Sequence, residues 1–217
     1  MIDSYKTVGE NTYEMIKKDI IFGNLKPLKK LKLNELKNNY KTSISTLREI
    51  LSRLSGDGFV VYEEQKGFYV SPVSESDLKE IANLRILIES HALKYSLENS
   101  NPDWEGSLLA AHHKLNLYEN KLLKNKTEER SNWKRYDSEF HQTLVRNCNS
   151  KNLIELHKLI FDKYLRYQLL VLTFRGSGSI EEHKKLLDYC LERNFKKAQM
   201  VLEEHIQNGI IHANKSF

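Results

Sequence analysis

The segment from Leu33 to Pro72 constrains the fold more than any other part of this 217-residue chain. Apolar residues recur at helical spacing in two short runs. They are Leu33 and Leu36 in the first run, and Ile44, Leu47, Ile50, Leu51 and Leu54 in the second. Two strand-like runs follow at residues 59–62 and 68–71, joined by a polar loop that contains Gly67. Two helices followed by a strand pair are the order of a winged helix-turn-helix.

The second of these helices has the features of a nucleic-acid reader. Thr42 and Ser43 are candidate N-caps, and Gly56 and Gly58 can end the helix because glycine accepts left-handed backbone angles. From Lys26 to Arg48 the chain has seven Lys/Arg and one acidic residue, and attraction of phosphates is the usual use of such charge. A solvated basic surface on an ordinary small domain is the alternative. The DNA-contacting candidates are Lys41, Ser43, Ser45, Thr46, Arg48, Lys66 and Gly67.

The order of these motifs resembles the DNA-binding domain of the GntR superfamily of bacterial transcription regulators, over about sixty residues. The matching stretches are Ile20–Pro27, Ser45–Leu51 with Leu54, Gly58–Val60 and Gly67–Val70. The chain differs from the family pattern at Leu28, where glycine is preferred, at Asn34, which is often arginine, and at Ile44, where many members carry a base-reading arginine. The resemblance implies DNA binding and leaves the operator sequence open.

The rest of the chain reads as helical. A first helix is expected over Thr7–Gly23, with Val8, Thr12, Met15, Ile16, Ile20 and Phe22 near one side. The segment Ser71–Ser74 marks a boundary, so we expect a winged helix-turn-helix domain at residues 1–73 and a second domain at residues 77–217. Six helices are expected in the second domain: Asp77–Asn99, Asp103–Lys124, Thr127–Asn147, Ser150–Phe174, Ile180–Arg193 after the break at residues 176–178, and Asn194–Ala213.

A helical domain of this size behind a winged helix resembles the FadR-type C-terminal sensor domain of one GntR subfamily. The motifs that carry this resemblance are Leu84–Glu89, Asp137–His141 and the Glu-His pairs at 182–183 and 204–205. The expected fold is therefore mainly α, with an N-terminal winged helix-turn-helix followed by an all-α six-helix bundle sensor domain. In the family, the matching positions hold a divalent metal with an open coordination position that a small carboxylate effector fills.

The spacing of four residues also points to a metal site. Asp137 and His141 are four residues apart and share one helical face. If the last two helices form a hairpin turning near Asn194, His183 and His205 each lie 11 residues from the turn and reach the same height. One carboxylate and three imidazoles suit zinc, nickel, manganese or iron, and zinc is our first expectation. The alternative is a surface Asp-His pair and hydrogen-bonded core histidines.

Other histidines have weaker claims. His212 is a rival to His205, because it lies seven residues further on and shares its face. The remaining four are interpreted as surface or packing residues: His91, His112, His113 and His157.

Arg85 is the candidate effector-binding residue. It lies on an apolar face between Leu84 and Ile88, where a guanidinium is costly unless it has a partner. An effector carboxylate is one candidate partner, and a structural bridge to Glu89, to Asp137 or to another helix is the alternative. Further candidates for the pocket are Tyr167, Gln168 and Arg175.

The sequence also bears on location and chemistry. No apolar run approaches the roughly 20 residues of a membrane span, and the polar start of the chain does not resemble a secretory signal. Cys148 and Cys190 are isolated, as expected for unpaired thiols in a reducing cytoplasm. We therefore expect a cytoplasmic protein without a membrane partner.

These observations predict a transcription regulator. By family resemblance it is a repressor that binds a palindromic double-stranded DNA operator as a homodimer and is released by a small organic acid. The alternative is a metal-dependent hydrolase with an accessory DNA-binding domain, in which Glu182 or Glu204 would act as general base. Neither an HExxH run nor a nucleophile elbow is present to support an enzyme.

Overall fold

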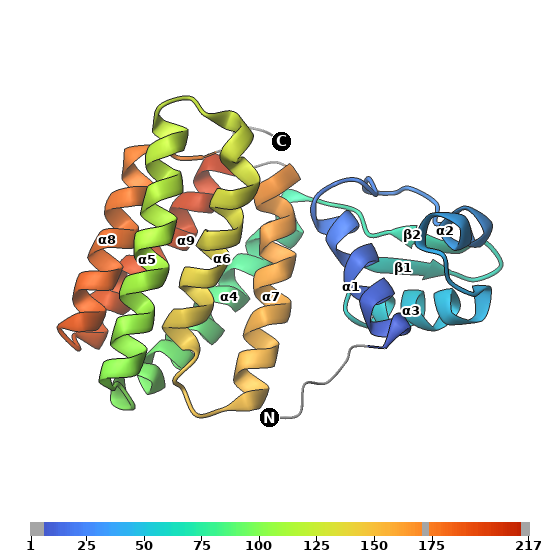
Figure 1. Cartoon of the computed structure of the whole chain (residues 1–217). Coiled ribbons are helices and arrows are strands. Elements are labelled where there is room, and N and C mark those ends of the chain that lie inside the picture. Colours follow the sequence, from blue (N-terminus) through green and yellow to red (C-terminus); the bar gives the residue numbers. More distant parts are fainter. Residues whose placement is uncertain (1–6, 171–173, 214–217) are drawn as a thin grey trace. The chain divides into compact units, whose positions relative to one another are not determined.

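The chain divides after Ser74 into two units, Met1–Ser74 and Glu75–Phe217, each of which folds around its own core (Figure 1). The computed structural model describes residues 7–170 and 174–213. Within those ranges there are nine α-helices and one two-stranded sheet, which confirms the mainly α fold with an N-terminal wing.

The first helix, α1 (Val8–Ile21), starts at a capping box in which Thr7 and Glu10 bond each other's backbone N–H groups. Its buried side includes Ile16 and Ile20. The prediction that Val8 and Met15 share this side is wrong, because their exposed fractions are 71% and 52%. Both lie about 80–100° around the helix axis from Ile16, outside the stripe that packs on the core.

Helices α2 (Leu33–Tyr40) and α3 (Ile44–Gly56) form the expected helix-turn-helix. Lys41 makes the turn in the left-handed region, with φ 50°. Ser43 caps α3, since its side chain accepts a hydrogen bond from Thr46 N. The inner face of α3 is fully buried, and it consists of Leu47, Ile50, Leu51 and Leu54.

The wing is an antiparallel pair of strands, β1 (Val60–Glu63) and β2 (Gly67–Val70), with Val60 opposite Val70. The first strand starts one residue later than the sequence predicted, and the second starts one residue earlier. The segment before α2 joins this sheet, because Leu28 N donates to Val70 O and Lys30 pairs with Tyr69.

The described part of the second unit, residues 75–170 and 174–213, contains six long helices, as predicted (Figure 1). They are α4 (Glu75–Glu98), α5 (Pro102–Leu123), α6 (Arg130–Val145), α7 (Lys151–Leu170), α8 (Ser177–Leu191) and α9 (Phe195–Ala213). Most helix ends lie within two residues of the prediction, and three differ by more. Residues Thr127–Glu129 form a separate 3-10 turn before α6, and Phe174, beyond the undescribed residues 171–173, is not helical. Helix α8 includes Gly178, because the break is confined to Gly176, whose φ is 71°.

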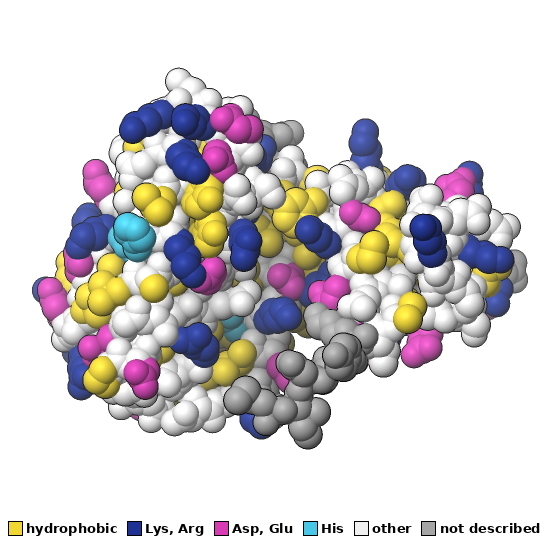
Figure 2. All heavy atoms as spheres, in the orientation of Figure 1, with side chains coloured by type: hydrophobic (Ala, Val, Ile, Leu, Met, Phe, Trp, Pro, Cys, Tyr) yellow, Lys and Arg dark blue, Asp and Glu magenta, His cyan; other side chains and the backbone are white. Residues whose placement is uncertain are grey.

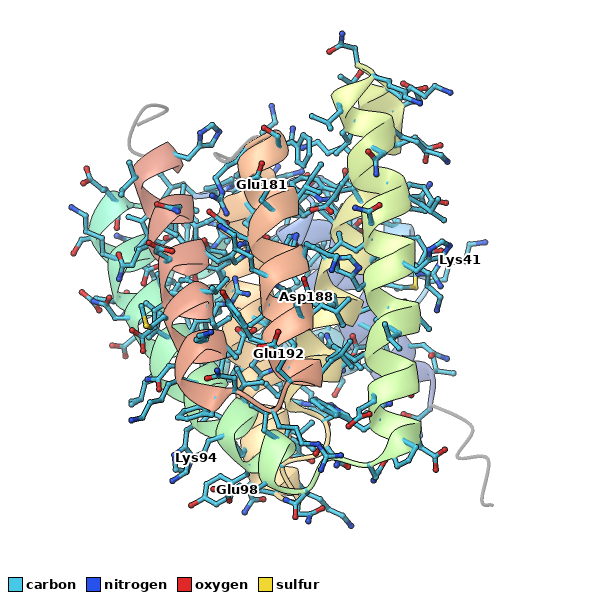
Figure 3. The ribbon with its side chains drawn as sticks, turned by 90° about the vertical axis from the view of Figure 1, so that its left-hand side faces the viewer. Lys41, Lys94, Glu98, Glu181, Asp188 and Glu192 are labelled. Carbon is cyan, nitrogen blue, oxygen red and sulfur yellow. The ribbon has the colours of Figure 1, made fainter. Side chains whose placement is uncertain are left out.

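Packing of the helices α4 to α9 on one another encloses the interior of the second unit. Helix α4 packs against α6, α7 and α9, while α5 packs against α6 and α8. Helices α8 and α9 form a hairpin, and Figure 3 shows Glu181 and Asp188 on the outer side of α8. His183 therefore lies on the inner face of this helix, where it is buried. Helix α9 approaches Tyr164 so closely at Gly209 that any Cβ there would overlap the tyrosine hydroxyl.

Two further expectations concern membrane helices and cysteines. Across residues 7–170 and 174–213, no helix combines the length and apolarity needed to cross a bilayer. Cys148 and Cys190 are free and buried, as expected. Burial raises the pKa of the Cys190 thiol to about 12, so this thiol stays protonated and unreactive at neutral pH.

Candidate metal centre and nucleic-acid interface

Four side chains from three helices converge in the interior of the second unit: Asp137 and His141 of α6, His183 of α8 and His205 of α9. Each offers one ligand atom, and these atoms all lie within 4.8 Å of one another. Two atoms bound to one ion at roughly 2.0–2.2 Å can be no more than about 4.4 Å apart. A small contraction would therefore let the four atoms share an ion.

The hairpin expected from the sequence places two of the histidines together. Helix α8 ends at Leu191 and α9 begins at Phe195, so the turn lies around Asn194. The ring centroids of His183 and His205 are 4.5 Å apart. All four cluster residues are buried, and Figure 2 accordingly shows few histidine side chains on the face it presents.

Each imidazole in the cluster is oriented by a glutamate that bonds its Nδ1 atom. Glu89 of α4 bonds His141, Glu119 of α5 bonds His183 at 2.7 Å, and Glu182 of α8 bonds His205 at 2.8 Å. A carboxylate at Nδ1 favours the tautomer with the proton on that nitrogen and the lone pair on Nε2, as in metal-binding histidines.

The atoms left over by this arrangement fit a cation. His141 Nε2, His183 Nε2 and Asp137 Oδ2 are buried and have no hydrogen-bond partner among the described residues. Buried polar atoms without a partner are rare, because each costs the desolvation energy of an unmade bond. A divalent ion would satisfy all three, and the nitrogen and oxygen donors suit zinc or a similar first-row metal.

The protonation states are those that metal binding requires. Burial and the neighbouring His183 lower the pKa of His205 well below its ordinary value, and burial likewise lowers the pKa of His141 despite Glu89. Burial by itself would raise the pKa of Asp137, but attraction to the Lys134 ammonium holds that pKa below its ordinary range. At neutral pH, His141 and His205 are thus neutral imidazoles and Asp137 is a carboxylate, as metal ligands must be.

A small cavity of about 20 Å³ adjoins the cluster. Besides Asp137, His183 and His205, its lining consists of Trp133, Lys134, Tyr164, Gln168, Arg175, Ser179, Gly209 and His212. Gln168 and Arg175 therefore lie where the sequence suggested a pocket. Tyr167 is not in the lining, and its hydroxyl donates to Asp77 instead. His212 lines the cavity but is not one of the four convergent residues.

Arg85 forms the bridge to Glu89 that was one of its two interpretations. Its Nε donates to Glu89 Oε2 at 2.7 Å, and its guanidinium lies 4.5 Å and 4.6 Å from the ring centroids of Phe161 and Tyr164. Its Nη atoms are buried and have no hydrogen-bond partner in the described structure. Arg85 does not line the cavity and supports the carboxylate that holds His141. Its contact with an effector stays a prediction.

The supporting residues were largely missed in the sequence. Glu119 has no spacing relation to the histidines, because its contact with His183 depends on how α5 and α8 pack. Lys134 shares a face of α6 with Asp137, but the spacing alone does not show that its side chain is buried there. Glu182 was considered as a general base, but its carboxylate is engaged by His205, Arg175 and Asn208. Glu204, the other candidate base, is exposed.

The four remaining histidines lie outside the cluster, as interpreted. His112 and His157 are buried, while His91 and His113 are exposed. His112 packs edge-on against Phe140, with 5.7 Å between the ring centroids.

In the first unit, the predicted DNA-contacting side chains lie on and around α3 and the wing. Lys41, Ser43, Ser45, Arg48 and Lys66 are exposed, whereas Thr46 and Gly67 are half-buried. A groove of about 640 Å³ runs between the helix-turn-helix and the wing, and Arg48, Lys66 and Gly67 are in its lining. Lys30 and Lys32 line the same groove, which the sequence had not singled out. The groove is therefore basic, as binding to phosphates requires.

Comparison with known proteins agrees with both halves of this description. Residues 8–70 match the model of bacterial regulatory proteins of the gntR family, and residues 80–208 match the FCD domain. The HTH-type transcriptional regulator BphR of Paraburkholderia xenovorans (strain LB400) is 28% identical over 211 residues, covering 96% of this chain and 86% of that protein. The HTH-type transcriptional repressor GlaR of Escherichia coli (strain K12) is 29% identical over 205 residues, covering 91% and 92%.

The structure of E. coli McbR/YncC has the same fold, with a TM-score of 0.80, 20% identity and coverage of 97% of this chain and 98% of that one. These similarities indicate a DNA-binding regulator of transcription rather than an enzyme, so the hydrolase alternative has no support. The chain belongs to the GntR family of bacterial transcription regulators, with an N-terminal helix-turn-helix domain and a C-terminal FCD domain.

Proposed function

We propose that this chain is a cytoplasmic repressor whose operator binding is controlled by a small carboxylate effector at a metal site in the FCD domain. The observation that carries the proposal is the cluster of Asp137, His141, His183 and His205. Its atoms His141 Nε2, His183 Nε2 and Asp137 Oδ2 are buried without a hydrogen-bond partner among the described residues, and three of its residues line a cavity. Repression is supported by the likeness to GlaR, which is named a repressor.

The DNA contacts are assigned to the first unit. The N-terminus of α3, capped by Ser43, offers side chains and backbone N–H groups to an operator, and Arg48 is the exposed cation nearest the middle of that helix. Lys66 in the wing contributes a phosphate contact. A single winged helix-turn-helix domain contacts only a few base pairs, so we propose a homodimer that binds a palindromic site.

The effector site is assigned to the second unit. The four cluster residues would hold a divalent ion, which would supply a Lewis-acidic position for a carboxylate oxygen of the effector. The chain's own residues do the rest: Glu89, Glu119 and Glu182 orient the imidazoles, and Arg175, which is paired with Glu182, lines the cavity. Arg85 fixes Glu89 and is retained as a candidate for effector contact.

Control of DNA binding requires that the effector prefer one arrangement of the protein over another. A cavity of about 20 Å³ holds little more than one water molecule. Any organic acid must therefore displace lining side chains of α6, α7, α8 or α9 when it binds. This displacement is the source of the differential affinity that we propose.

Fluorescence anisotropy with the chain's own promoter DNA tests this function. The protein loaded with zinc should bind the promoter, and at least one acid from a panel of small carboxylates should weaken that binding by about tenfold or more. The same acid should have no effect after the metal is removed with a chelator. Failure to bind the promoter contradicts the DNA-binding role, and binding that no acid alters contradicts effector control.

A further inference from the structure

Lys134 is an unusual residue to find beside a cation site. It lies one helical turn before Asp137 on α6, and its side chain is only 2% exposed. Its Nζ atom lies 3.7 Å from Asp137 Oδ2, beyond hydrogen-bond distance, and 3.8 Å from the centroid of the Trp133 ring. It also lines the cavity next to the cluster.

This ammonium group is poorly satisfied in the described structure. It has three N–H donors, yet its closest anionic atom is the Asp137 oxygen at 3.7 Å, and a buried charge without good partners is costly. Arg175, the other cation in the lining, is different. Its guanidinium is paired with Glu182, with Nη1 3.0 Å from Oε1, and it also reaches the carbonyl oxygen of His205. Lys134 is therefore the cation at this cavity whose bonding capacity is least used.

Metal binding would leave Lys134 with less compensation still. A divalent ion bound by Asp137 would draw on the same carboxylate that Lys134 faces, so the ion and the ammonium would share one anionic partner. Arg175, by contrast, has Glu182 as its own partner. A ligand with one carboxylate for the ion and a second for Nζ would match both positions, and the short distance between Nζ and the Asp137 carboxylate favours a compact one.

We propose that Lys134 is a specificity-determining residue that selects short dicarboxylates, one carboxylate facing the metal-binding residues and the other accepting hydrogen bonds from Lys134 Nζ. This inference rests on the proposed function, in which an acid binds at the cluster. The competing interpretation is that Lys134 only pairs with Asp137. In that case its loss would affect acids with one and with two carboxylates equally.

Calorimetric titration of the zinc-loaded full chain separates the two interpretations. The probes are acids matched in carbon number, succinate against butyrate and glutarate against valerate. Wild-type protein should bind the better dicarboxylate about tenfold or more tightly than its matched monocarboxylate. In Lys134→Met, that preference should shrink to within about threefold, while the zinc content and the monocarboxylate affinity stay near wild type.

Control variants guard against indirect effects. Lys184→Met removes an exposed lysine of α8 that pairs with Asp188, and it should keep the wild-type preference. Lys134→Gln should lose the preference as Met does, so the test survives if either variant folds poorly by thermal melting. If both Lys134 variants keep the full preference for dicarboxylates, or if the wild-type protein has no such preference, the inference about Lys134 is overturned and the proposed function is not. If none of the four acids binds the loaded wild-type protein, the effector function fails with it.

Discussion

Three imidazoles and one carboxylate converge in the FCD domain, and glutamates from α4, α5 and α8 orient the imidazoles. The glutamates at 89, 119 and 182 each bond an Nδ1 atom, so the Nε2 atoms point away from their orienting carboxylates. Loss of such an outer carboxylate typically costs about 10–100-fold in metal affinity. These glutamates are therefore as much a part of the site as the four candidate ligands.

Acid should weaken both folding and metal binding. The pKa values of His141 and His205 lie below the ordinary value of about 6.5. The unfolded chain therefore takes up protons first as the pH falls. The stabilisation by these neutral imidazoles is complete above about pH 6.5 and declines below it. We expect the melting temperature of chelator-treated protein to fall from pH 7 to pH 5, and bound metal to dissociate below about pH 6. A melting temperature that is flat between pH 5 and pH 7 would contradict this.

The backbone of Leu28 adopts an unfavourable conformation, and a substitution can remove its energetic cost. Its φ is 65° and its side chain is 69% exposed, so it occupies the left-handed region without burying surface in return. This explains why the family pattern has glycine there. We expect Leu28→Gly to raise the unfolding free energy by about 1 kcal/mol, measured by urea denaturation.

The adjacent Lys29 supplies the matched control for that substitution. It is also exposed, but its φ is not positive. Lys29→Gly should therefore lower the stability, because glycine there gains nothing in the folded state. Equal losses in the two variants would show that Leu28 is not strained.

At the residue scale, the sequence predicted what local spacing can show. The pair Asp137 and His141 follows from one helical turn, and His183 with His205 follows from their symmetry about the turn near Asn194. Glu119 and Lys134 could not be predicted in the same way. Their roles arise from contacts between α5 and α8 and from the burial of α6, and no periodic pattern in the sequence specifies those.

Among the elements, α3 has two faces with separate tasks. Leu47 and Leu51 anchor it in the core, while Arg48 is exposed and lines the groove beside the wing. We expect Arg48→Ala to weaken operator binding by about 1–3 kcal/mol without changing the melting temperature. Lys94→Ala, which removes an exposed lysine of α4 in the other unit, is the control and should leave binding unchanged. Operator binding by Arg48→Ala at wild-type strength would show that this helix face does not contact DNA.

Helix existence was predictable from periodicity, whereas helix ends were less so. All six helices of the second unit were expected, since their apolar residues recur at helical spacing. The start of α8 was misplaced because three small residues at 176–178 resemble a loop, although only Gly176 adopts a positive φ. Both wing strands were predicted one residue out of place. The residue pattern of so short a strand does not define its ends, which depend on its pairing with the other strand.

For the whole molecule, two winged helix-turn-helix domains are needed for useful operator affinity. We expect a homodimer by light scattering at micromolar concentration and one dimer bound to each palindromic site in native mass spectrometry. Symmetric half-sites follow from the two-fold axis of such a dimer. A monomer that still binds the operator tightly would contradict the proposed assembly.

The metal content of the purified full chain decides whether Asp137, His141, His183 and His205 form a metal site. Wild-type protein should hold about one divalent ion per chain, and this ion should raise the melting temperature because it binds the folded state. His183→Ala combined with His205→Ala should abolish both the ion and this stabilisation, while promoter binding by the other unit persists. The exposed pair, His91→Ala with His113→Ala, should keep the ion and the stabilisation. Two results would contradict this assignment. One is wild-type protein that holds no metal and whose melting temperature a chelator leaves unchanged. The other is a full complement of metal in the His183 and His205 double variant.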